Sequence, residues 1–244
     1  MKAIILSAGQ GSRLGHLVDN GPKCLIDFNG RTLLDRQLDT LAANGVDEAV
    51  VVTGFRDDTI EAALATRGGG PKVRTVYNPF YKVADNLGSL YVAKHEIEGE
   101  CLVWNGDTLV SDALMARVLG NDRQGIAVTI DRKDSYDADD MKVQVEGTRL
   151  LDIGKTLPLD LVNGESIGML LFRGTGPRLF CDAVERAMRQ PEGLKWWYLK
   201  VIAQIAKVDE VQTALIQGLS WGEVDYPADL IRAERLAEAW ERRS

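Results

Sequence analysis

The feature that most constrains the fold is a regular alternation of strand-like and helix-like segments through the first half of the chain. Short apolar runs predict strands at Lys2 to Leu6, Glu48 to Thr53, Val73 to Tyr77 and Cys101 to Trp104. Periodic stretches between them predict helices at Thr32 to Ala43, Asp57 to Thr66 and Leu87 to Ile97. Strands separated by helices of this length form a mostly parallel sheet with helices on both faces. We therefore predict an α/β fold.

The pattern changes after about residue 125. Four strand-like runs separated by turns follow, at Ile126 to Asp131, Lys142 to Glu146, Arg149 to Ile153 and Ser166 to Phe172. The simplest account is a region of antiparallel strands appended to the parallel core. The remaining residues predict helices at Pro177 to Arg189 and Leu194 to Ala206, a strand at Val211 to Gln217 and a closing helix from Tyr226. No internal repeat, low-complexity tract or linker interrupts the chain, so we predict one domain over residues 1–244.

Composition and charge exclude several classes of partner. The net charge of −7 gives the protein no general attraction to nucleic acid or to an anionic membrane, so any phosphate site must be local. The N-terminal run MKAIILSAG is too short for a signal peptide or a membrane span. Cys24, Cys101 and Cys181 are odd in number and widely spaced, which indicates reduced thiols and a cytoplasmic protein.

The first loop combines bare backbone with positive charge. It follows the strand at Lys2 to Leu6 and reads Ser7-Ala8-Gly9-Gln10-Gly11-Ser12-Arg13. Ligands of open α/β sheets bind at the carboxyl ends of the strands, and glycines there let a phosphate approach consecutive backbone N–H groups. Arg13 can add a bidentate clamp, and Lys23, stiffened by Pro22, a point charge. The loop is therefore a candidate phosphate cradle.

Two common phosphate-binding motifs are excluded. A dinucleotide-binding GxGxxG needs glycine where this chain has Leu14, and the Gly-Lys-Ser/Thr of a Walker A loop is missing. Taken alone, the two glycines fit a phosphate cradle and an ordinary turn equally well. The phosphate interpretation gains its weight from the segments that follow.

Several segments in combination resemble the sugar-phosphate nucleotidylyltransferases. SAGQGSRL followed by PKCL resembles the signature of that family, and LVWNGDTL resembles its apolar strand ending in Gly-Asp. DIGKTL resembles the segment with its acceptor-phosphate lysine, and SWGEVDYPADL its late segment before the last helix. NLGSLYVAK, DDMKV and GESIGMLLF are most similar to the small cytidylyltransferases that act on phosphocholine, 2-aminoethylphosphonate or inositol phosphate. The resemblance implies a Rossmann-like (GT-A-like) fold, with a nucleotide-binding half at about 1–125 and an acceptor-binding half at about 126–244.

The resemblance also implies an enzyme, in which a phosphate or phosphonate oxygen attacks the α-phosphorus of a nucleoside triphosphate and releases pyrophosphate. Such catalysis is mostly positioning and charge stabilisation. Matched to the family's motifs, Arg13, Lys23 and Asp107 are catalytic, with Arg13 at the pyrophosphate and Lys23 near the α-phosphate. The nucleotide-binding residues are then Ser7, Ala8, Gly9, Gly11, Ser12, Arg13, Lys23, Asn78, Asn86, Gly88 and Ser89.

Asp107 and Asp225 match the two aspartates with which the family holds Mg²⁺, a cation that takes one or two carboxylates besides phosphates and water. From the residues alone, Asp107 also fits a turn or helix-capping aspartate, and Asp225 the N-cap of the final helix. Asn78 likewise fits a turn before a proline, and Asn86 a helix cap. We expect a Mg²⁺ site at the two aspartates.

The acceptor should lie against the second half of the chain. The resemblance assigns Lys155 to the acceptor's phosphoryl group. Aromatic faces and carboxylates suit a cationic head group, because cation–π attraction replaces the hydrogen bonds that a trimethylammonium group cannot make. We expect the acceptor-binding residues to be Asp140, Lys155, Glu165 and Trp197. The Trp196–Tyr198 run also fits the buried face of a helix.

The preferred function is Mg²⁺-dependent transfer of CMP from CTP to phosphocholine or 2-aminoethylphosphonate. An alternative of the same class is UTP- or dTTP-dependent transfer to a hexose 1-phosphate or an inositol phosphate. An alternative of another class is a catalytically silent nucleotide-sensing protein, although such a protein is expected to lose one of the charged residues named above. The sequence leaves open whether the protein is a homo-oligomer and whether Trp104 faces the site.

Overall fold

Nine strands form one mixed sheet in the computed structural model, which describes residues 1–14 and 21–242. Four neighbouring parallel strands make up its first half, in the order β5 (Lys72–Tyr77), β4 (Glu48–Thr53), β1 (Lys2–Leu6) and β6 (Cys101–Asn105). These are the strands that the apolar runs predict. Because they are parallel, their carboxyl ends lie at one edge of the sheet.

The second half of the sheet is mostly antiparallel and continuous with the first. β11 (Gly164–Arg173) pairs antiparallel with both β6 and β8 (Gly125–Asp131), so it lies in the middle of the sheet and not at an appended edge. β12 (Val211–Leu215) runs parallel to β8, and β10 (Arg149–Ile153) and β9 (Lys142–Glu146) complete the order. Because the sheet crosses the boundary at about residue 125, it supports the proposal of a single domain.

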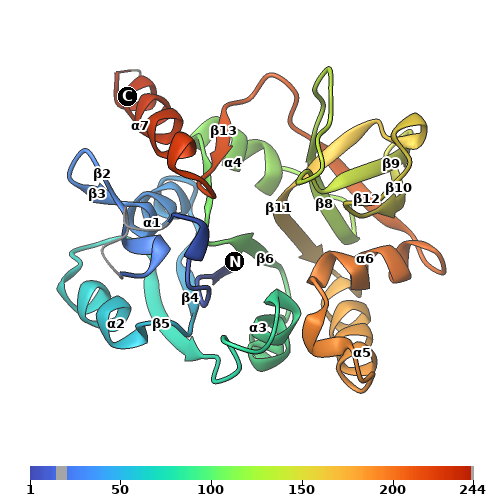
Figure 1. The fold of residues 1–244 in the computed structure, drawn as a ribbon, viewed down its shortest axis with the longest axis horizontal. Coiled ribbons are helices and arrows are strands. Elements are labelled where there is room, and N and C mark those ends of the chain that lie inside the picture. Colours follow the sequence, from blue (N-terminus) through green and yellow to red (C-terminus); the bar gives the residue numbers. More distant parts are fainter. Residues whose placement is uncertain (15–20, 243–244) are drawn as a thin grey trace.

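Helices cover both faces of the sheet (Figure 1). The described residues form α1 (Leu33–Ala43), α2 (Asp57–Thr66), α3 (Asn86–Val92), α4 (Asp112–Leu119), α5 (Gly176–Met188), α6 (Tyr198–Ala206) and α7 (Pro227–Glu241). The core under α3, α5 and α6 contains Ile4, and the core under α1, α2 and α4 contains Ile5. Successive residues of β1 thus face opposite sides, which is the pattern of a strand buried on both faces.

The closing helix returns to the first half of the molecule. In Figure 1, α7 lies beside the small hairpin of β2 (Asp27–Phe28) and β3 (Arg31–Thr32). Ala233 of α7 packs in a separate apolar cluster with Phe28, Leu33 and Val224. The last helix therefore stabilises the part of the molecule that carries the first loop.

A two-stranded ribbon joins the late part of the chain to the end of β6. β7 (Thr108–Val110) pairs antiparallel with β13 (Trp221–Glu223). At the end of this pairing, the backbone N–H of Val224 donates to the carbonyl oxygen of Asp107 at 3.0 Å. The ribbon thereby places Asp225 next to Asp107, although the two residues are far apart in the chain.

The structure differs from the predicted elements in several places, and the hairpin of β2 and β3 is one element that was not predicted. The helix expected at Leu87 to Ile97 ends at Val92 and is followed by a short 3-10 helix at Lys94–Glu96. The helix expected at Leu194 to Ala206 begins only at Tyr198, because Trp196 and Trp197 have extended backbone with ψ of 143° and 145°. Helix α4 and the ribbon of β7 and β13 have no counterpart among the predicted elements.

The three cysteines are free thiols, of which Cys24 and Cys101 are buried. Burial raises the pKa of each of these two thiols to about 12, so both stay protonated and unreactive at neutral pH. Among the described residues, no helix combines the length and the apolar character needed to cross a membrane.

The start of α1 offers a test of local stability. The Thr32 hydroxyl accepts from the backbone N–H of Asp35 at 3.0 Å, and the Asp35 carboxylate accepts from the backbone N–H of Thr32, which completes a capping box. We expect Thr32→Ala to lower the free energy of unfolding by about 1 kcal/mol in urea denaturation. Thr175→Ala is the matched control, because Thr175 caps α5 without a side-chain hydrogen bond. Equal losses from the two variants would contradict the capping argument.

Candidate active site

The first loop forms one wall of a cavity at the carboxyl edge of the parallel strands. The cavity measures about 340 Å³, and it is lined by Leu6, Ser7, Gly9, Gly11, Ser12, Arg13, Lys23, Cys24, Asp85, Gly106, Asp107 and Asp225. Gly11 has φ of +62°, and a Cβ there would lie 3.0 Å from Cβ of Lys23. The loop therefore needs glycine at this position both for its backbone conformation and for its contact with Lys23.

Lys23 lies between the two predicted metal aspartates. Its Nζ is 3.0 Å from Oδ2 of Asp107 and 2.6 Å from Oδ1 of Asp225. Burial opposes the charged form, but the two carboxylates more than compensate and hold the pKa of Lys23 above its ordinary value. The two aspartates thus converge on a single cationic group.

Tight packing fixes the turn that carries Asp107. The backbone N–H of Gly106 donates to the carbonyl oxygen of Leu6 at 3.0 Å, and a Cβ on Gly106 would lie 2.4 Å from that oxygen. Any larger residue would push the turn away from β1. Behind the turn, the Gln37 amide donates to the carbonyl oxygens of Asn105 and Thr108. The position of the Asp107 carboxylate is therefore fixed by both strand and helix.

The capping alternatives for the two aspartates are not what the structure shows. Ser111, and not Asp107, caps α4 through its side chain. Asp229 accepts from the backbone N–H groups of Asp225 and Tyr226 at the start of α7. The Asp225 side chain is thus directed at Lys23 and Arg13, whose Nη1 lies 3.4 Å from Asp225 Oδ2.

The charges around the two aspartates fit a cation. Burial, and after it the negative charge of Asp107 and Asp225, raise the pKa of Glu223 to about 8. No group of three or more potential metal ligands occurs among the residues that the structure describes. Mg²⁺ commonly uses only one or two carboxylates and completes its shell with phosphates and water. Asp107 and Asp225 therefore fit such an ion.

A second cavity of about 600 Å³ opens beside the first. Arg13, Asp107 and Asp225 line both cavities, so the two spaces meet at these side chains. The predicted acceptor residues that line the second cavity are Asp140, Lys155, Glu165 and Trp197. Hollows of about 480 and 590 Å³ exist elsewhere on the molecule, but neither contains either aspartate. The site is therefore distinguished by Asp107 and Asp225 and not by the volume of its cavities.

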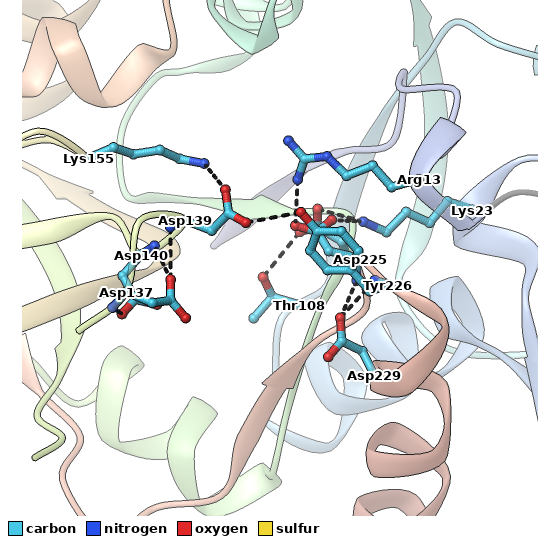
Figure 2. Close-up of polar contacts among 11 residues, drawn as sticks. Arg13, Lys23, Thr108, Asp137, Asp139, Asp140, Lys155, Asp225, Tyr226 and Asp229 are labelled. Carbon is cyan, nitrogen blue, oxygen red and sulfur yellow. Dashed lines mark hydrogen bonds and ion pairs between the residues drawn. The ribbon is translucent and has the colours of Figure 1, made fainter. Parts of the chain in front are cut away.

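A chain of polar contacts crosses the second cavity (Figure 2). Lys155 Nζ lies 3.5 Å from Asp139 Oδ1 and 4.6 Å from the ring centre of Trp197. The hydroxyl of Tyr226 donates to Asp139 Oδ2 at 3.0 Å, and Arg13 lies 5.6 Å from the Tyr226 ring. These contacts connect Arg13 of the first loop with Lys155 on the acceptor side through Tyr226, which precedes α7.

Asp140 and Glu165 are brought together, but around a lysine that the sequence analysis did not single out. Lys133 Nζ lies 2.7 Å from Asp140 Oδ2 and 2.9 Å from Glu165 Oε2. Burial, above all, raises the pKa of Glu165 to about 7. For Lys133 burial acts the other way, yet the hydrogen bonds to both carboxylates hold its pKa above the ordinary value.

The residues predicted to contact base and ribose lie partly in the interior and partly at the second cavity. Asn78 and Ser89 are buried and bonded to each other at 3.1 Å, and the Asn78 side chain also accepts from the Phe80 N–H, as expected of a turn residue. Gly88 is buried against Ala84. The carbonyl oxygen of Ala8, itself buried, accepts from the Phe55 N–H. Neither cavity is lined by Asn78, Ser89, Gly88 or Ala8, so the structure does not bring these predicted contacts into the site. Asn86 lines the second cavity, and its side chain accepts from the backbone N–H of Tyr198.

The structure also separates the aromatic residues into core and site. Trp104 and Tyr198 are fully buried, and the Tyr198 hydroxyl donates to Asn105 at 3.0 Å. Trp196 is half-buried against the core. Trp197 is 40% exposed and faces the second cavity, because the extended backbone before α6 turns it outward.

Of the charged or polar residues that line the site but were missed from sequence, three matter most to the contacts and charges described above. Lys133 follows β8 in a run rich in charges, Glu223 ends β13, and Tyr226 precedes the proline of α7. The only signal available was that Glu223 and Tyr226 belong to the segment SWGEVDYPADL, which the family resemblance had already singled out. Nothing in the local sequence pairs Lys133 with Asp140 and Glu165.

A glycine-rich loop, two convergent aspartates and an adjoining cavity lined by lysines, arginines and carboxylates on one α/β sheet form the arrangement expected of a nucleotidyltransferase. The chain belongs to the family of MobA-like NTP transferase domains, whose profile matches residues 3–207. Family membership confirms the predicted enzyme class.

Known relatives agree with this assignment. Over 98% of its length the chain is 32% identical to the bifunctional IPC transferase and DIPP synthase of Rubrobacter xylanophilus, of which it covers 52%. Over 42% of its length it is 32% identical to the choline-phosphate cytidylyltransferase of Streptococcus pneumoniae, of which it covers 43%. The structure of the inositol-1-phosphate CTP transferase from T. maritima has the same fold, with a TM-score of 0.82 at 23% identity over 98% of this chain and 96% of that one. The chain spans about half the length of the curated relatives it matches.

The raised pKa of Glu165 predicts a pH effect on stability. Its carboxyl titrates near 4.5 in the unfolded chain and at about 7 in the folded protein, so the folded protein binds more protons between these values. The contribution of Glu165 to stability should therefore fall as the pH rises from about 4.5 to about 7. We expect Glu165→Gln to flatten that fall in thermal unfolding scans, and Glu146→Gln, at an exposed position, to leave it unchanged. Parallel pH profiles for all three proteins would contradict the assignment.

Proposed function

We propose that this protein transfers CMP from CTP to the phosphate or phosphonate oxygen of a small head group and releases pyrophosphate, with Mg²⁺ as the required cation. The observation that carries the proposal is that two cavities share Arg13, Asp107 and Asp225. One cavity can hold a triphosphate and the other a phosphorylated acceptor, so that the two substrates meet at the shared side chains. Holding two reactants in this way supplies much of the rate enhancement of such transfers.

The first loop would hold the triphosphate. Backbone N–H groups around Gly9, Gly11 and Ser12 suit the β- and γ-phosphates, because they lie at the carboxyl end of β1 in the wall of the first cavity. Arg13 stabilises charge on the departing pyrophosphate, and Lys23 stabilises charge near the α-phosphate. An acceptor oxygen forms the new bond to the α-phosphorus while the bond from that phosphorus to the oxygen bridging to the β-phosphate breaks.

The acidic pair would hold the metal ion. Asp107 and Asp225 already share one cationic group, the Lys23 ammonium, at 3.0 and 2.6 Å. When bound, Mg²⁺ would neutralise phosphate charge and so reduce the repulsion between two anionic substrates. The chain's own contribution is to fix both carboxylates, through the turn after β6 and through the ribbon of β7 and β13.

Lys155 would bind the phosphoryl group of the acceptor. It lies in the second cavity, held by Asp139 and by the ring of Trp197. The names of the relatives support CTP as donor and a small phosphorylated head group as acceptor, since they include a choline-phosphate cytidylyltransferase and an inositol-1-phosphate CTP transferase. The sequence favours phosphocholine or 2-aminoethylphosphonate as the acceptor, and the second of these names supports inositol phosphate, which the sequence analysis gave as an alternative.

Pyrophosphate release is the direct test of the function. CTP, UTP, dTTP, ATP and GTP would each be combined with phosphocholine, 2-aminoethylphosphonate, inositol 1-phosphate and glucose 1-phosphate, with and without Mg²⁺. We expect release only with CTP and a head-group phosphate. Release confined to UTP or dTTP with a hexose phosphate would replace the donor and acceptor proposed here. Binding of nucleotide without release from any pair would favour the sensor alternative.

The two aspartates give a second prediction. We expect Asp107→Asn and Asp225→Asn each to lower pyrophosphate release by about a hundredfold or more at saturating CTP, because each removes charge from the metal-binding pair. Asp160→Asn serves as the control, since Asp160 is an exposed aspartate in the short 3-10 helix at Leu159–Leu161. Activity of Asp107→Asn equal to that of the control would contradict the metal assignment.

Lys155 gives a third prediction that separates acceptor from nucleotide. Lys155→Met should raise the KM of the acceptor about tenfold or more, because a charge-assisted contact with its phosphate is lost. The Kd of CTP, measured by calorimetry, should remain unchanged. Lys195→Met, at an exposed position outside both cavities, is the control. A weaker affinity for CTP with an unchanged acceptor KM would place Lys155 in the nucleotide site instead.

A further inference from the structure

Lys133 places an ammonium group of the protein inside the acceptor cavity. The residue follows β8 and lines this cavity together with its two carboxylate partners. Its Nζ lies within 3 Å of both Asp140 and Glu165, whose side chains are only 12% and 8% exposed. The ring of Tyr136 lies 5.7 Å from the same nitrogen. Lys133 is therefore a cation paired with two largely buried carboxylates in the lining of the cavity.

The surroundings of Lys133 are those that a pocket for an external ammonium group would provide. A cationic head group needs buried carboxylates and an aromatic face. Here two carboxylates and one tyrosine ring already surround a cation that belongs to the chain. A second cation could approach Asp140 and Glu165 only beside Lys133 or in its place. The first case brings like charges together, and the second leaves the lysine without partners.

The other acids on the acceptor side also have partners. Asp139 accepts from Tyr226 and lies beside Lys155, whose ammonium in turn covers the ring of Trp197. Asp131 accepts from the indole N–H of Trp221 at 2.7 Å. The Asp137 carboxylate accepts from the backbone N–H groups of Asp139 and Asp140. The carboxylates and the exposed tryptophan that suggested a cationic acceptor are thus satisfied within the protein.

We propose that Lys133 is an internal counter-ion which excludes cationic head groups from the acceptor cavity. It thereby selects an acceptor whose phosphate is attached to an uncharged, hydroxyl-bearing head group. The proposal rests on the proposed function and names the acceptor class of the same site. Hydroxyl groups can donate to the remaining lone pairs of Asp140 and Glu165 and accept from the third N–H of Lys133, without displacing the ion pairs. A polyol phosphate therefore gains hydrogen bonds at the place where a cationic head group would be repelled by the Lys133 ammonium.

The test compares two acceptors of different charge with CTP as donor. The measured quantity is kcat/KM for inositol 1-phosphate divided by kcat/KM for phosphocholine. We expect a large ratio for the wild-type protein and a ratio lower by about a hundredfold or more for Lys133→Met, because removal of the lysine leaves an unoccupied cation site. Lys133→Arg keeps the charge and should keep the preference.

Two controls separate this role from a structural one. Lys82→Met removes a lysine that also lies over a tyrosine ring, Tyr81, but outside the acceptor cavity, and it should not change the ratio. In Lys133→Ala, added propylammonium should suppress turnover of phosphocholine and restore the preference for inositol 1-phosphate, whereas it should leave the wild-type protein unaffected. A loss of packing alone would not respond to an external ammonium ion.

The outcomes distinguish the two proposals. Pyrophosphate release from neither acceptor in the wild-type protein, with CTP bound, would overturn the proposed function. Efficient release from phosphocholine by the wild-type protein, or an unchanged ratio in a folded Lys133→Met variant, would overturn the role of Lys133 and leave CMP transfer in place. A shifted ratio that propylammonium reverses would establish the role of Lys133.

Discussion

The contact on which the site depends is the ammonium group of Lys23 held between the carboxylates of Asp107 and Asp225. Two carboxylates this close repel each other, and their charge adds to the effect of burial in raising the pKa of Glu223 beside them. A cation must therefore be present whenever the first loop, the turn after β6 and the ribbon before α7 come together. Lys23 supplies that cation from the chain, and the same two carboxylates then suit a metal ion when anionic substrate brings its own charge.

Much of the fold could be predicted from the sequence because its signals are local. The apolar runs of β1 and β4 and the capping box before α1 depend on neighbouring residues alone. The first loop and Asp107 could be predicted for a related reason, since both follow parallel strands whose carboxyl ends must meet at one edge. The family matches confirm the fold and the enzyme class, whereas the roles of the single residues stay predictions.

Other features depend on contacts between distant segments, which leave no local signal. β11 inserts antiparallel between β6 and β8, although its sequence shows only a long apolar run. Trp197 has helical spacing but takes an extended conformation, so it faces the cavity and not the core. The sequence indicated that Asp140 and Glu165 are available acids, but not that Lys133 neutralises them. Their number suggested a cationic acceptor, whereas their pairing with Lys133 is the basis of our proposal of an uncharged head group.

The same principle organises both cavities, because four cations of the site, Arg13, Lys23, Lys133 and Lys155, are each held by a carboxylate of the chain. Arg13 and Lys23 share Asp225, Lys155 lies beside Asp139, and Lys133 pairs with Asp140 and Glu165. For a reaction between two anions, a cluster of free basic side chains would repel itself in the empty protein. Internal ion pairs hold these side chains in place, and an incoming phosphate can exchange with a carboxylate instead of ordering a mobile lysine. Tyr226 connects the two sides, because its hydroxyl binds Asp139 while its ring lies against Arg13. Since Tyr226 immediately follows Asp225, a displacement of Asp225 is transmitted through Tyr226 to Asp139 on the acceptor side, and a displacement of Asp139 is transmitted to Asp225.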